Sequence, residues 1–190
     1  MKNKNEIQFP LGMKIDFEAL GTNVGVEIVV SDKDQIVLAE KNFKDIISLY
    51  AEFENIFSRF DSKSELSELN SRIGKFNLAS LHMRKIASLS LIYNEKTEGR
   101  YDPRILNDLE KFGYAEDFKT GVRKKGESLD STLESCCKGL KHDLKIKEDS
   151  VFFGCRMDFS GIAKGYITDQ IVEFLDNHGW KNFLIDSGGD

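Results

Sequence analysis

Alternating apolar and polar positions open the chain. The stretch "FEALGTNVGVEIVVS" alternates around a Gly-Thr break, which is typical of a half-buried strand or hairpin. From about Lys33 to Phe60 the apolar side chains recur close to a helical period, which predicts one long helix. "SRFDSKSELSELN" interrupts this pattern, and Ser64 is placed to cap a short helix that has Glu65 in its first turn.

The middle of the chain contains a second helical pattern. "LASLHMRKIASLSLIYNEKTEG" predicts an amphipathic helix with Gly99 just beyond its end. In "YDPRILNDLEKFGY" the proline favours an extended Asp102, with a short helix after it. Residues 118–150 are polar and rich in Lys, Glu and Gly with little periodicity, so we expect them to be the most mobile part of the chain.

The last segment combines two strands and a helix. "SVFFGCRMDFS" predicts a strand that enters a turn at Ser160 and Gly161, and "IAKGYITDQIVEFLDNHG" predicts a helix that stops at Gly179. "WKNFLIDSGGD" predicts a strand that ends in a glycine turn. Because strands and helices do not alternate as in a doubly wound sheet, we expect an α+β fold with a mostly antiparallel sheet packed against long helices. The 190 residues are expected to form a single domain over 1–190.

Composition excludes several classes of protein. With 27 Lys and Arg against 32 Asp and Glu, the net charge of −5 argues against a nucleic-acid surface. The chain has neither a signal peptide nor an apolar run approaching the roughly 20 residues of a membrane span, so we expect a cytoplasmic protein. The three cysteines lack CxxC spacing and predict free buried thiols. The three histidines are scattered in stretches typical of exposed helix or loop, and no His-rich metal site is expected.

The strand, Ser-Gly and helix pattern near the end predicts an anion site. Unpaired N–H groups and the helix dipole face the same point, and Lys164 adds a full charge. An equally open alternative is that Ser160 only caps the helix and Lys164 is solvated. Asp158 is placed to accept a hydrogen bond from a ligand hydroxyl or base, whereas Asp169 is expected to be a structural partner of a backbone or cationic group. The Gly-Gly turn would admit a phosphate, although most such turns are only tight turns.

Several of these segments also carry a family resemblance. "DFSGIAKGYITD" followed by "GWKNFLIDSGGD" resembles the hallmark region of the ApbE family, the FAD:protein FMN transferases. "ALGT", "FSRFDSKSELSELN" and "YDPRILNDLEKFGY" are similar to earlier family segments in the same order. The resemblance implies cleavage of the FAD pyrophosphate with Mg²⁺, transfer of FMN to a Thr or Ser of an acceptor flavoprotein, and release of AMP. A flavin-binding module without transferase activity and an FAD pyrophosphatase are the alternatives.

The resemblance also implies roles for individual residues. Phe60 would stack on a ring of the ligand, and Leu20 would pack on the flavin end. The remaining expected contacts are Arg100, Tyr101 and Asp102 with the flavin dinucleotide, Asp158 with its adenosine part, Lys164 with its phosphates, and the Gly161 backbone carbonyl with Mg²⁺. Other interpretations place Leu20, Phe60 and Tyr101 in the core, leave Asp102 only a turn residue, and make Ser64 and Asn70 structural.

Two departures from the family pattern affect these expectations. Arg104 stands where relatives usually carry threonine, so this segment is expected to contact the ligand differently. The family pattern continues beyond the Gly-Gly-Asp turn and includes further magnesium ligands and a histidine near the reacting group. We therefore expect this chain to be incomplete at its C-terminus, with the catalytic residues and the remaining metal ligands outside it.

Overall fold

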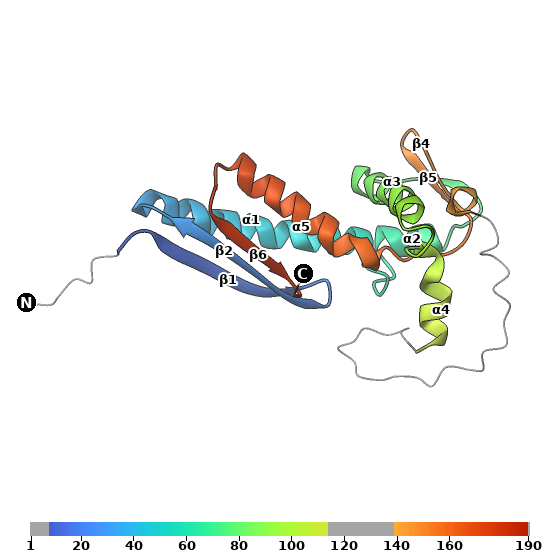
Figure 1. Cartoon of the computed structure of the whole chain (residues 1–190), viewed down its shortest axis with the longest axis horizontal. Coiled ribbons are helices and arrows are strands. Elements are labelled where there is room, and N and C mark those ends of the chain that lie inside the picture. Colours follow the sequence, from blue (N-terminus) through green and yellow to red (C-terminus); the bar gives the residue numbers. More distant parts are fainter. Residues whose placement is uncertain (1–7, 114–138, 190) are drawn as a thin grey trace, which may run out of the picture. The chain divides into compact units, whose positions relative to one another are not determined.

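The computed structural model describes residues 8–113 and 139–189, and Figure 1 shows their helices and strands. These residues group into two compact units. Unit 1 contains the described residues up to Ala51 and those from Ile167 onward, and unit 2 runs from Glu52 to Tyr166. Each unit has a three-stranded sheet in which all neighbouring strands are antiparallel. The predicted α+β class with antiparallel pairing is confirmed, and the single domain stays a prediction.

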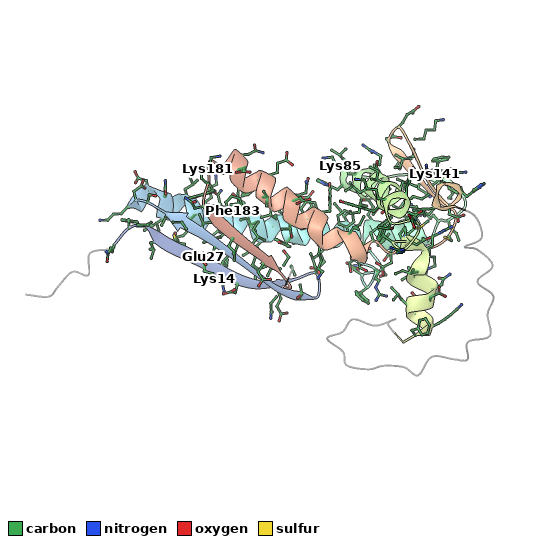
Figure 2. The ribbon with its side chains drawn as sticks, in the orientation of Figure 1. Lys14, Glu27, Lys85, Lys141, Lys181 and Phe183 are labelled. Carbon is green, nitrogen blue, oxygen red and sulfur yellow. The ribbon has the colours of Figure 1, made fainter. Side chains whose placement is uncertain are left out.

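The sheet of unit 1 has the order β1-β2-β6, with β1 at Leu11–Ala19, β2 at Thr22–Val30 and β6 at Phe183–Ser187. The alternation along β2 gives one buried and one open face. Lys14 lies opposite Glu27 on the open face (Figure 2). The predicted hairpin and the predicted C-terminal strand are therefore confirmed. The fully buried side chains of β2 are Val24, Val26, Ile28 and Val30.

Two long helices contribute to both units, α1 at Lys33–Phe57 and α5 at Ser160–Asn177. In unit 1 they cover the apolar face of the sheet (Figure 1), where the Tyr50 ring packs edge-on against Phe17 at 5.2 Å between centroids. The Tyr50 hydroxyl forms a hydrogen bond of 2.7 Å with the Ser187 hydroxyl at the end of β6. The predicted long helix is confirmed, although it ends at Phe57 and not at Phe60.

Unit 2 contains several shorter elements around a second sheet of order β3-β5-β4. Its buried side chains include Leu144 and Phe153 from facing positions of β4 and β5. The elements are α2 (Glu65–Asn70), β3 (Phe76–Leu78), α3 (Leu81–Lys96), η1 (Pro103–Ile105), α4 (Leu106–Lys111), η3 (Leu140–His142), β4 (Leu144–Lys147) and β5 (Ser150–Phe153).

The predicted helix boundaries in unit 2 are confirmed. Ser64 caps α2 by accepting a hydrogen bond of 3.1 Å from the Ser67 N–H. Gly99 follows α3 with a φ of +81°, and Asp102 is extended, with φ −143° and ψ 118°. One expectation is wrong: β4 lies inside the segment predicted to be mobile, because "LKIK" alternates over too few residues to stand out. Residues 118–138 of that segment lie outside the described residues.

The histidine and cysteine expectations are partly wrong. His82 is half-buried, its Nδ1 lies 2.7 Å from the Tyr166 hydroxyl, and burial lowers its pKa. His142 and His178 are exposed, as predicted. Cys155 is half-buried and not fully buried as predicted, because the apolar positions of β5 end before it, whereas positions 136 and 137 lie outside the described residues. Among the described helices, none is both long and apolar enough to cross a membrane.

The glycine turn after β6 provides a test of close packing. Gly188 and Gly189 have φ values of +79° and +87°, but only Gly188 is crowded, since a Cβ atom there would lie 2.6 Å from Thr22 Oγ1. We expect Gly188→Ala to lower the free energy of unfolding by about 3 kcal/mol and Gly189→Ala by only about 1 kcal/mol. Urea unfolding of both variants measures the difference, and equal losses would contradict the packing argument.

Candidate functional site

The site begins at the N-terminus of α5. The Asp158 side chain is only 2% exposed, and its Oδ1 accepts a hydrogen bond of 2.7 Å from the Ser160 N–H. Asp158 therefore caps α5, and Ser160 and Gly161 form the first turn of the helix. The predicted turn at these two residues is wrong, and so is the alternative in which Ser160 is the cap. The reason is that the Asp158 carboxylate satisfies the first free N–H, which lets helical geometry start at Ser160.

Arg59 connects this carboxylate to the ring of Phe60. Its Nε lies 3.3 Å from Asp158 Oδ2, and its side chain is 9% exposed. Its guanidinium carbon lies 4.2 Å from the centroid of the Phe60 ring, which is itself exposed. Sequence reasoning missed Arg59, although its position beside Phe60 in the "FSRFDSKSEL" segment was a usable signal.

Asp158 Oδ2 is the unusual atom of this cluster. It is buried, and it accepts no hydrogen bond from any residue within 8–113 and 139–189. A buried carboxylate oxygen normally accepts hydrogen bonds, because leaving it without them is costly. An N–H or O–H donor of a ligand would supply the hydrogen bond that this oxygen lacks among the described residues.

Tyr101 packs against the first turn of α5. A Cβ atom at Gly161 would lie 3.3 Å from Tyr101 Cε2, so the glycine allows the ring to approach the helix closely. The Tyr101 hydroxyl lies 3.0 Å from Ser90 Oγ, and Asn94 donates a hydrogen bond of 2.7 Å to the Tyr101 carbonyl. Burial raises the pKa of Tyr101 to about 12, so the ring is neutral at physiological pH.

The first turn of α5 also keeps a free donor. Within the described residues nothing accepts a hydrogen bond from the Gly161 N–H, and Gly161 is exposed. Lys164 lies one turn further along the same helix and is half-buried. An exposed N–H, the positive end of the helix dipole and a lysine side chain together favour a phosphate group.

Asp102 is engaged by the protein itself. The Arg104 guanidinium donates to both Asp102 oxygens, at 2.6 Å from Nη2 to Oδ2 and 3.0 Å from Nε to Oδ1. Its Nη1 also donates to Asp143 Oδ2 at 2.8 Å, and the Arg104 side chain is 5% exposed. Arg104 therefore bridges the carboxylates of Asp102 and Asp143, an interaction that threonine, the usual family residue at this position, could not form. Direct contact of Asp102 or of the exposed Arg100 with a ligand stays a prediction.

Two other expectations about polar residues have different outcomes. Asn70 is structural, as predicted, because its side-chain amide bonds the Met157 carbonyl at 2.9 Å and the Met157 N–H at 2.8 Å. This fixes the backbone immediately before Asp158. Asp169 is exposed, and its side chain has no hydrogen bond or ion pair with another described residue, so its predicted role as a structural partner is wrong. Its position on the solvent-facing side of α5 accounts for this.

Leu20 is the one predicted ligand contact in unit 1. It forms the tip of the β1–β2 hairpin with Gly21, and the two residues have φ values of +54° and +73°. Two residues at positive φ are typical of a type I′ turn, in which Asn-Gly is the preferred pair. A leucine here is strained and is half-buried.

This strain leads to a prediction of opposite effects on stability and binding. We expect Leu20→Asn to raise the free energy of unfolding by about 0.5 kcal/mol, since asparagine tolerates positive φ. If Leu20 contacts the flavin, the same variant binds FAD more weakly. Thermal unfolding and an FAD titration check the two effects, and a variant with unchanged FAD affinity would remove Leu20 from the site.

The residues of unit 2 thus combine three kinds of recognition. Phe60 offers an open aromatic face, Asp158 a buried acceptor, and the first turn of α5 with Lys164 an anion site. Such a set suits a ligand that has a planar ring, a hydrogen-bond donor and phosphates. For Mg²⁺ the described residues do not suffice, because they contain no group of three His, Cys, Asp or Glu side chains that could hold a metal ion.

Comparison with known proteins identifies the family of this chain. A sequence profile of the ApbE family matches residues 20–190, so the chain belongs to the ApbE family. A protein of Treponema pallidum (strain Nichols), named FAD:protein FMN transferase, is 21% identical over 159 residues, which are 77% of this chain and 42% of that protein. The protein of the same name from Buchnera aphidicola subsp. Schizaphis graminum (strain Sg) is 25% identical over 150 residues, 73% of this chain and 42% of that protein.

Solved structures confirm the fold. A mutant of the flavin transferase ApbE from Vibrio cholerae superposes with a TM-score of 0.80 at 20% identity, over 94% of this chain and 61% of that chain. The apo flavinyl transferase ApbE of Pseudomonas stutzeri gives a TM-score of 0.77 at 18% identity, over 97% and 61% of the two chains. The chain spans less than half the length of the curated relatives it matches.

Proposed function

We propose that this protein takes part in FAD:protein FMN transfer and that unit 2 binds the FAD. The observation that carries the proposal is the N-terminus of α5, where among the described residues the buried Asp158 Oδ2 and the Gly161 N–H each lack a hydrogen-bond partner, and Lys164 follows one turn later. Family membership and the names of the curated relatives support the same reaction.

In the proposed reaction a Thr or Ser hydroxyl of an acceptor flavoprotein attacks the FMN phosphorus of FAD. The new ester bond forms as the pyrophosphate P–O bond breaks, the hydroxyl loses its proton, and AMP leaves with the electron pair of the broken bond. Charge develops on the phosphate oxygens in such a transfer. The helix N-terminus and Lys164 would hold and partly neutralise this charge, and Phe60 and Asp158 would orient the ligand.

We also propose that the reaction depends on Mg²⁺. The Gly161 carbonyl would give the ion one oxygen ligand, and the other ligands would come from outside the described residues. The ion would supply charge neutralisation at the pyrophosphate when bound.

Removing the lysine charge should weaken FAD binding. We expect Lys164→Ala to reduce the binding free energy of FAD by about 1–3 kcal/mol, the range of hydrogen bonds to charged groups. The matched control is Lys85→Ala, which removes an exposed lysine from α3 in the same unit (Figure 2). Fluorescence titration with FAD measures both variants, and equal affinities for Lys164→Ala and the control would remove Lys164 from the site.

The transferase proposal is tested by incubating the protein with FAD, Mg²⁺ and an acceptor flavoprotein domain. We expect mass spectrometry to detect FMN on a Thr or Ser of the acceptor, with an equal amount of AMP released. AMP and free FMN without a modified acceptor would indicate an FAD pyrophosphatase instead. FAD that stays bound and intact would indicate a flavin-binding module.

A further inference from the structure

We infer that Arg59 is a positioning residue of the proposed FAD site. Its guanidinium fixes the positions of the Phe60 ring and the Asp158 carboxylate relative to each other. The inference rests on the proposed function, because it assigns Arg59 a role in FAD binding. Its basis is one guanidinium that lies 4.2 Å from the Phe60 centroid and 3.3 Å from Asp158 Oδ2.

The first step of the argument concerns charge. A carboxylate that is 2% exposed requires a nearby countercharge, and Arg59 supplies it from a side chain that is itself 9% exposed. Arg59 lies just beyond α1, whereas Asp158 precedes α5. Their attraction therefore fixes the loop that carries Phe60 against the N-terminus of α5.

The second step concerns the hydrogen-bonding capacity that Asp158 Oδ2 retains in its ion pair with Arg59. The buried Arg104 of the same unit donates hydrogen bonds to its two carboxylate partners, at 2.6 Å to Asp102 Oδ2 and 2.8 Å to Asp143 Oδ2. Asp158 Oδ2 instead has its countercharge at 3.3 Å and still accepts no hydrogen bond among the described residues. The arginine thus holds the carboxylate in place while the oxygen keeps its lone pairs for a ligand donor.

The third step concerns the aromatic ring. A guanidinium over one face of a phenylalanine ring holds that ring by a cation–π contact and leaves the other face open. Phe60 is 42% exposed, which agrees with an open face. A planar ring of the ligand would therefore stack on a Phe60 ring that is positioned by the Arg59 guanidinium, the same group that positions Asp158.

A double-mutant cycle with FAD as the probe tests this inference. Arg59→Met keeps most of the side-chain volume and removes the charge, and Asp158→Asn removes the partner. We expect each single variant to bind FAD about 10-fold more weakly, and the double variant to bind only slightly more weakly than Asp158→Asn, since coupled residues are not additive. Arg156→Met, which loses a closer ion pair in the same unit, should keep wild-type affinity.

The conservative variant Arg59→Lys covers the case in which Arg59→Met does not fold. It keeps the charge, but its compact ammonium cannot lie flat on Phe60 and also reach Asp158. We expect Arg59→Lys to fold with a wild-type melting temperature and to bind FAD about 3-fold more weakly.

The outcomes separate the inference from the proposed function. A wild-type chain that does not bind FAD would overturn both. Wild-type FAD binding together with unchanged affinity in Arg59→Lys and Arg59→Met, or with fully multiplicative losses in the cycle, would overturn the role of Arg59 alone. A loss in Arg156→Met as large as that in Arg59→Met would also overturn it, because the loss of any arginine ion pair in the unit would then have the same effect.

Discussion

Replacing Arg104 with methionine is expected to lower the free energy of unfolding by about 3 kcal/mol. The Arg104 guanidinium is 5% exposed and holds the Asp102 and Asp143 carboxylates, whose side chains are 20% and 21% exposed. Arg104→Met leaves both carboxylates without their shared cation in partly buried positions. Two negative charges would then repel each other where water screens them poorly.

Urea unfolding followed by circular dichroism measures this loss. The matched control is Arg72→Met, which removes an arginine from the exposed pair with Glu68 at 3.6 Å. That exposed pair is expected to contribute less than about 0.5 kcal/mol. Similar losses in the two variants would contradict the view that Arg104 organises the segment around Asp102.

Asn70→Ala is expected to lower the free energy of unfolding by about 3 kcal/mol and also to weaken FAD binding. The Asn70 amide satisfies the Met157 N–H and carbonyl, and both residues are buried. Alanine leaves two buried backbone groups without partners, each costing about 1–3 kcal/mol. Because Met157 directly precedes Asp158, the carboxylate of the proposed site would move with it.

Asn77→Ala is the matched control for Asn70→Ala, for both stability and FAD binding. The Asn77 amide donates to the Arg72 and Lys75 carbonyls at 3.0 and 3.1 Å, but these bonds are exposed, so water can replace them. We expect a loss of less than about 1 kcal/mol and an unchanged FAD affinity. If Asn70→Ala lost stability but bound FAD like the wild type, Met157 would not position Asp158.

Most of the local structure could be predicted from the sequence because its signals are local. The alternation of β2 and the helical period of α1 are each read within one segment, and so are the Ser64 cap and Gly99. β4 could not be predicted, since its four residues acquire their strand geometry only by pairing with β5. Residues far apart in the chain determine that pairing.

The site could be predicted only in part, for the same reason. The sequence indicated Asp158 and Lys164 by their positions around a helix start, but not the countercharge of Asp158. Arg59 lies about a hundred positions before Asp158 in the sequence, and only the fold brings the two together. The pairing of Arg104 with Asp143 is likewise long-range and explains why an arginine occurs in that segment.

The most direct test of the central claim is amide hydrogen exchange of the wild-type protein with and without FAD. If FAD binds at the N-terminus of α5, exchange should slow at Gly161 and in the rest of the first turn of α5, and in the loop that carries Arg59 and Phe60. The β4–β5 hairpin of the same unit should be unchanged. Slowed exchange elsewhere, with the first turn of α5 unaffected, would contradict the account.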